Sequence, residues 1–124
     1  MSIRAVNAYK RVDLESAPKT QIVDRLFERF SRDLDDTRAA LAKKDIKGKA
    51  AALDHATQIV AELRAALDHS VAPELCANLD ALYGVVMLRL SECNLSLDPK
   101  PLEHAGFIMA ELGSAMREAG AAQR

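Results

Sequence analysis

Residues 76–94 read CANLDALYGVVMLRLSECN, a stretch whose apolar side chains fall on more than one side of a helix. A helix in a small bundle needs a single apolar stripe, with residues spaced by three and four positions. The stretch and the residue before it contain such a stripe, which consists of Leu75, Leu79, Leu82, Val86 and Leu90. We therefore expect a helix whose stripe faces a core, with further apolar residues left outside it.

Three other segments carry the same helical spacing, and no segment carries the sustained alternation of a β-strand. Four such helices joined by short loops predict an all-α fold, an antiparallel up-down-up-down four-helix bundle. The expected core positions of the three segments are Val23, Phe27, Phe30, Leu34, Thr37 and Leu41; Leu53, Ala56, Val60, Leu63 and Leu67; and Leu102, Ala105, Met109, Leu112, Met116 and Ala119.

Helix boundaries are marked by capping residues at three places. Ser16 can cap the first helix, Asp45 the second and Asp98 the fourth, because short polar side chains accept hydrogen bonds from the first free backbone N–H groups. We expect residues 16–124 to form the bundle domain. Residues 1–15 show only a short apolar pattern and predict a flexible N-terminal arm or short helix.

Composition excludes several classes of protein. Of the 124 residues 49% are hydrophobic, 4% are aromatic and none is Trp, and the net charge is −1. A nearly neutral chain with few aromatic residues lacks the basic and stacking surfaces of a nucleic-acid-binding protein. No segment resembles a signal peptide or a membrane helix, so we expect a cytoplasmic protein without membrane contacts. Cys76 and Cys93 lie too far apart on one helix for a disulfide bond and should be reduced.

No pattern of catalytic or metal-binding residues occurs. None of the three histidines follows a Glu by three positions, as a di-iron bundle site requires. The Cys-x-x-Cys-His motif that attaches haem covalently is also absent from the sequence. His55 is the one candidate for a phosphotransfer histidine, but an ordinary surface histidine fits the sequence around it better. We therefore predict a protein that is not an enzyme and has no cofactor or metal.

The surplus apolar residues raise the question of what covers them. In a four-helix bundle Val85 and Leu88 would face outward, Ile59 would lie off the seam of the second helix, and Phe107 off that of the fourth. Together they would form a patch too large for an ordinary monomer surface. The N-terminal arm could fold over it, two chains could form a weak homodimer, or a monomer could bind an amphipathic segment of another protein.

The order of several short motifs resembles the flagellin-specific export chaperones, the FliS family. The resemblance extends over nearly the whole chain, although Leu26–Phe27 is offset from the family pattern, so the chain resembles a divergent member. The matching residues are Ala8–Tyr9, Ser16–Ala17–Pro18, Lys44–Asp45, Leu67–Asp68, Asn78, Leu79, Leu82, Tyr83 and Cys93–Asn94.

This resemblance implies a chaperone for the disordered C-terminal segment of flagellin, which would prevent premature polymerisation and assist delivery to the gate of the type III export apparatus. The alternative is a helical adaptor or regulatory protein that binds an amphipathic segment of another partner. In the family the N-terminal arm is thought to cover part of the client groove. The residues that we expect to contact flagellin are Val6, Tyr9, Ile59, Asn78, Tyr83, Val85, Leu88 and Phe107.

Overall fold

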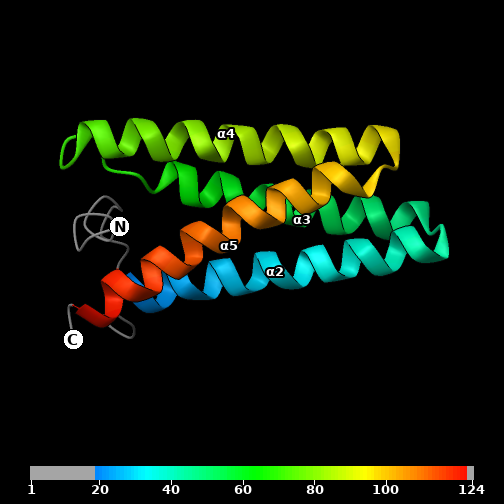
Figure 1. Cartoon of the computed structure of the whole chain (residues 1–124), viewed down its shortest axis with the longest axis horizontal. Helices are drawn as coiled ribbons and strands as arrows, with labels where there is room; N and C mark the ends of the chain where they lie inside the picture. The colour runs from blue at the N-terminus through cyan, green and yellow to red at the C-terminus, as the bar shows by residue number, and fades with distance from the viewer. Residues whose placement is uncertain (1–18, 123–124) are drawn as a thin grey trace.

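The structure, a computed structural model, describes residues 19–122, and this part of the chain is a bundle of four helices (Figure 1). It contains no β-strand, which confirms the predicted all-α class. No helix in the described range combines the length and the hydropathy needed to cross a bilayer. The predicted arm and the Ser16 cap lie outside the described residues. The helices are α2 Lys19–Lys43, α3 Ile46–Ala65, α4 Pro73–Ser96 and α5 Pro99–Ala122.

The helices form a closed ring in which neighbours in the sequence are neighbours in space. α3 packs against α2 and α4, and α5 packs against α4 and also against α2. Lys44 and Asp45 alone separate α2 from α3, and Leu97 and Asp98 alone separate α4 from α5. Both of these tight connections lie at one end of the bundle, and the longer connection 66–72 lies at the other (Figure 1). The up-down-up-down prediction is confirmed.

Two of the predicted caps are present where the sequence placed them. The Asp45 side chain accepts a hydrogen bond from the Gly48 backbone N–H at 2.9 Å and caps α3. The Asp98 carboxylate accepts one from the Lys100 N–H, also at 2.9 Å, at the start of α5. Each cap satisfies a backbone N–H group that has no partner within the helix, and so fixes where the helix begins.

The core follows the predicted stripes on three helices, with one shift. At the end of α2 the small Ala40 is buried, whereas Leu41 is only half-buried. On α5 the stripe is buried from Leu102 to Met116. Cys76 and Cys93 are buried and form no disulfide bond with each other, and burial raises the pKa of both thiols. The buried apolar residues of α2 and α3 are Val23, Phe27, Phe30, Leu34, Ala40, Leu53, Ala56, Ile59, Val60 and Leu63, and Leu67 follows α3.

On α4 the predicted stripe was wrong at Leu75 and Leu82, because the core residue is the next one in each case, Cys76 and Tyr83. Tyr83 is fully buried, whereas Leu82, predicted for the core, is 37% exposed. The observed and the expected stripes both have spacings of three and four, and they share Leu79, Val86 and Leu90, so periodicity alone could not separate them. The buried residues of α4 are Cys76, Leu79, Tyr83, Val86, Leu90 and Cys93.

Ile59 was also misplaced by the sequence, because it lies in the core and not on the surface. It is buried beside Val60, its immediate neighbour in α3. Adjacent helical positions point about 100° apart, so α3 buries a wide arc. The reason is that α3 packs against both α2 and α4 and needs apolar residues toward each.

Two glycines of α5 allow close contact with α2. A Cβ atom at Gly106 would lie 2.9 Å from Leu34 Cδ1, and one at Gly113 would lie 3.2 Å from Phe27 Cδ1. Both distances are too short for an alanine to fit without movement of the neighbouring side chain. Close helix packing therefore accounts for these two glycines.

A salt bridge joins α3 to α4. The Arg64 guanidinium donates to both Asp80 oxygens, from Nε at 2.7 Å and from Nη2 at 3.1 Å. This two-point contact lowers the pKa of Asp80 below its usual value and raises that of Arg64. The flank of α4 that faces α3 is therefore polar in this region.

The corrected stripe predicts opposite outcomes for two positions of α4 that lie one helical turn apart. Val86→Glu should unfold the bundle, because a carboxylate in the core costs several kcal/mol, comparable to the whole stability of a small domain. Leu82→Glu should keep the helical circular dichroism signal and melt close to the wild-type temperature. Thermal melts of both variants test this, and unfolding of Leu82→Glu would contradict the assignment.

The Asp80 carboxylate should make stability depend on pH. Its pKa is depressed in the folded state, so the stabilisation is present above the unfolded pKa of about 3.9 and is lost as pH falls through the folded value. Arg64→Gln should therefore lower the urea midpoint at pH 7, and the difference should vanish in strong acid. The double variant Arg64→Gln/Asp80→Asn is the control and should show no such pH dependence relative to Asp80→Asn. A constant difference between wild type and Arg64→Gln from pH 7 to pH 3 would contradict this.

Candidate functional site

The outer side of α4 carries apolar residues that the bundle does not bury. Leu82 is 37% and Leu88 is 55% exposed, and Val85 between them is half-buried. Each step of three residues turns a helix by about 300°, so this line of side chains winds slowly around the outside of α4. It begins beside the core and ends on the face that points away from it.

One hydrogen bond shows which neighbour this line approaches. Arg89 Nε of α4 donates to His104 Nδ1 of α5 at 3.0 Å. Val85 lies four residues before Arg89, and the half-buried Ile108 lies four residues after His104. Because the two helices are antiparallel, both steps go the same way along the bundle and place Val85 level with Ile108. The apolar line therefore runs along the junction of α4 and α5.

Phe107 extends this surface on α5. Its side chain is 65% exposed, next in sequence to Ile108. An aromatic ring that is mainly in water on a short bundle is a large unburied apolar area. We call this surface the α4–α5 apolar face, and it consists of Leu82, Val85, Leu88, Phe107 and Ile108.

The structure brings together four of the eight residues predicted to contact a client. Val85, Leu88 and Phe107 belong to the α4–α5 apolar face, and Asn78 is exposed on the same side of α4, one helical turn before Leu82. Ile59 and Tyr83 lie in the core, so their predicted surface position is wrong. Val6 and Tyr9 lie outside the described residues.

Sequence reasoning missed Leu82 and Ile108 as members of this surface. Leu82 was assigned to the core by the one-position error on α4. Ile108 follows the exposed Phe107 and precedes the buried Met109, so its place at the edge of the stripe could have been read from the spacing. The pairing of Val85 with Ile108 depends on how two helices align, which periodicity does not reveal.

The two flanks of α4 differ in chemistry. On the α3 side lies the Arg64–Asp80 salt bridge, with Arg64 also 3.8 Å from the sulfur of Met87. On the α5 side the Arg89–His104 contact lies beside the apolar line. An amphipathic helix would thus find the apolar strip of Leu82, Val85 and Leu88 on the α5 side of α4, which gives a docking segment a defined place.

His55 has the geometry nearest to a catalytic group in the described part of the chain. Its Nδ1 lies 2.6 Å from Asp33 Oδ2, and its Nε2 lies 2.9 Å from Arg29 Nη2. A guanidinium can only donate, so Nε2 accepts the hydrogen bond from Arg29. Nδ1 then carries the ring hydrogen and donates a hydrogen bond to Asp33. Both ring nitrogens therefore take part in hydrogen bonds between α3 and α2.

Metal ligation has no support in residues 19–122, where no group of three or more His, Cys, Asp or Glu side chains could hold an ion. Asp33 is buried, but its carboxylate is used by His55. The feature of this region that calls for a function is therefore an apolar surface for another macromolecule and not a reaction centre.

Comparison with known proteins gives a consistent result over nearly the whole chain. Residues 2–123 match the family described as "Flagellar protein FliS". The flagellar secretion chaperone FliSB of Pseudomonas aeruginosa is 29% identical over 117 residues, which cover 91% of this chain and 93% of that protein. The flagellar secretion chaperone FliS of Escherichia coli is 32% identical over 122 residues, covering 93% and 88%. That of Vibrio cholerae is 29% identical over 115 residues, covering 90% and 85%.

Proposed function

The chain belongs to the family of the flagellar protein FliS, and from that premise we propose that it binds the disordered C-terminal segment of flagellin in the cytoplasm. As a flagellar secretion chaperone it would prevent premature polymerisation of flagellin and assist its delivery to the gate of the type III export apparatus. The relatives are named for secretion and not for a reaction, in keeping with a bundle that offers a surface in place of a catalytic group.

The α4–α5 apolar face is the observation that carries this proposal. A segment that is disordered when free pays for its ordering when it binds, so it needs several apolar anchors to reach a useful affinity. Covering the exposed parts of Leu88 and Phe107 would contribute roughly 1–2 kcal/mol each, and Leu82 less. A helix that places apolar residues every three or four positions would meet these anchors in turn.

Binding of this kind fits both parts of the proposed role. A flagellin segment held as a helix on the bundle is unavailable for assembly with other flagellin molecules. Binding therefore lowers the concentration of free segment from which polymerisation proceeds. The cost of ordering the segment keeps the affinity below that expected for a preformed interface of equal area. The client can then be released when the export gate takes it up.

Asn78 gives the face a polar contact near one end. Its side chain is exposed on the same side of α4 as Leu82 and Val85. An amide both donates and accepts, so it can bind the backbone of a segment that leaves the apolar strip. Val6 and Tyr9 stay predictions for the arm, which would cover part of the face until flagellin displaces it.

A charge at Leu88 should separate binding from folding. Leu88→Glu should melt like wild type, but it should weaken binding of a flagellin C-terminal peptide about a hundredfold, because a buried unpaired carboxylate costs several kcal/mol. Isothermal titration calorimetry measures the affinity, and circular dichroism reports the fold.

Ala39→Glu is the matched control for this experiment. It places the same charge on an exposed position of α2, the helix diagonally opposite α4 in the ring, and should bind the peptide like wild type. Equal affinity of Leu88→Glu and Ala39→Glu would remove the α4–α5 apolar face as the client site. Tight binding by wild type of an unrelated amphipathic helix, but not of the flagellin peptide, would favour an adaptor for another partner.

A further inference from the structure

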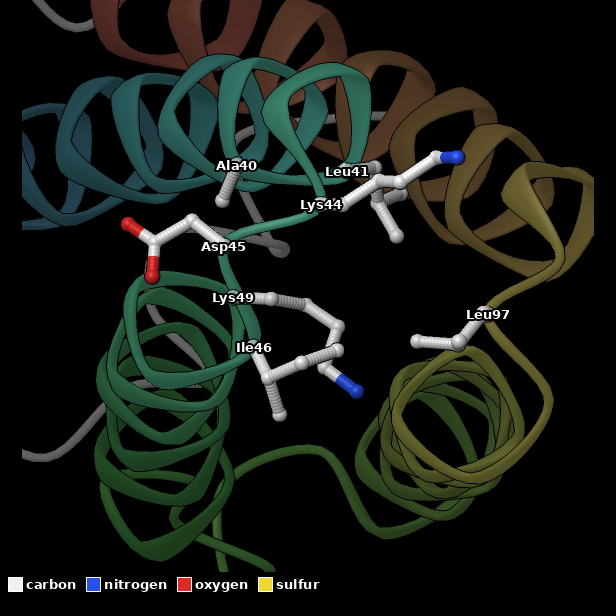
Figure 2. A pocket seen from close by; sticks show the side chains of 7 residues that line it. All are labelled: Ala40, Leu41, Lys44, Asp45, Ile46, Lys49 and Leu97. Carbon is white, nitrogen blue, oxygen red and sulfur yellow. The ribbon is translucent and has the colours of Figure 1, made fainter.

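The end of the bundle with the two tight connections contains a cavity that the proposed flagellin site does not use. Its volume is about 470 Å³, within the range of roughly 300–1,000 Å³ found for ligand pockets. We call it the bundle-end pocket (Figure 2), and none of its residues belongs to the α4–α5 apolar face. It is lined by Ala40, Leu41, Lys44, Asp45, Ile46, Lys49 and Leu97.

The walls of the bundle-end pocket are mainly apolar and open to solvent. Ile46 is 55% and Leu97 is 49% exposed, and Leu41 is half-buried. Leu97 reaches from the α4–α5 connection toward the side chains of Lys49 and Ile46 on α3 (Figure 2). Three aliphatic side chains from three different elements thus surround one space that an apolar side chain of another molecule could fill.

Two lysines give the pocket a positive charge. Lys49 is almost wholly buried, and its Nζ donates to the Asn94 carbonyl at the end of α4 at 2.8 Å. An ammonium has three donors, and this is the one bond that Lys49 makes among the described side-chain contacts. Lys44 lies on the opposite wall with its ammonium in water.

The one acidic group of the lining does not neutralise these lysines. The Asp45 carboxylate caps α3 through Gly48 and points away from Lys49 (Figure 2). Residues 43–49 read KKDIKGK, four lysines against one aspartate, in a chain whose net charge is −1. The pocket is therefore a basic site on a nearly neutral protein, complementary to a carboxylate.

Backbone conformation sets the same pocket apart. Lys44 has a φ of 58° and Leu97 a φ of 62°, and these are the two non-glycine residues with positive φ in the described part of the chain. Glycine is the usual residue at such helix ends, because any side chain adds strain there. Both positions nevertheless carry long side chains that line the pocket, and half of Leu97 remains in water. Strain retained without burial points to a use for these side chains.

We propose that the bundle-end pocket docks an acidic, amphipathic segment of a second protein. An apolar side chain of that segment would fill the space between Leu41, Ile46 and Leu97, and a neighbouring Asp or Glu carboxylate would pair with Lys44 and Lys49. The carboxylate would meet the unused donors of Lys49 in a sheltered place, where charge-assisted hydrogen bonds are strong. Since the pocket and the α4–α5 apolar face share no residue, both partners could be bound together.

The test is an NMR titration of the ¹⁵N-labelled full chain with two short peptides. The capped peptide acetyl-Glu-Leu-Leu-Glu-amide should shift the amide signals of Leu41, Ile46, Lys49 and Leu97. Its uncharged counterpart acetyl-Gln-Leu-Leu-Gln-amide should bind at least about tenfold more weakly. Equal binding of the two peptides, or shifts centred on Leu88 and Phe107, would overturn the proposal.

Glycine variants separate docking from folding at this site. Lys44→Gly and Leu97→Gly relieve the positive φ, so each should melt at or above the wild-type temperature. Each should nevertheless weaken the acidic peptide about tenfold, and Leu97→Gly should still bind the flagellin C-terminal peptide normally. If both variants bind the acidic peptide as tightly as wild type does, the Lys44 and Leu97 side chains do not contact the peptide, and the proposal is wrong. Tighter binding of single-stranded DNA than of the acidic peptide at this site would also overturn the proposal.

Discussion

Each helix in this ring has two neighbours, and this limits the arc of its surface that can be buried. α3 reaches this limit, because the adjacent residues Ile59 and Val60 are both buried. α4 and α5 exceed it, because Leu88 and Phe107 lie beyond the arcs that face the core. The α4–α5 apolar face is thus a result of packing geometry. Within residues 19–122 no third helix covers these side chains, which are nevertheless apolar.

Most of the fold follows from the sequence, because the helices and their boundaries depend on local chemistry. Asp45 and Asp98 are short polar residues directly before a helix, and each caps it. The buried positions of α5 recur every three or four residues. The stripe of α4 was less certain for a physical reason. Leu82 and Tyr83 are both apolar, and either completes a series through Leu79, Val86 and Leu90. The choice between them depends on how α4 is rotated against its neighbours, which is a tertiary property.

The candidate site was predictable only in part. Periodicity identified Val85, Leu88 and Phe107 as surplus, but it placed Ile59 outside the core, because it did not allow for a helix with two packed flanks. The bundle-end pocket had no signal in periodicity. It depends on two connections that meet in space and on the left-handed conformations of Lys44 and Leu97, and neither residue type predicts such a conformation.

The glycines that bring α5 against α2 have a consequence for how the protein is made. Leu34 and Phe27 are covered at Gly106 and Gly113, so the ring closes only when the earliest and the latest described helices meet. Glycine also lowers the stability of an isolated helix, so α5 depends on packing against α2. Contacts so distant in sequence form late, and on the ribosome they cannot form before α5 has emerged. Until then the nascent chain exposes the apolar surface of α2 and is itself open to the unwanted association that chaperones prevent.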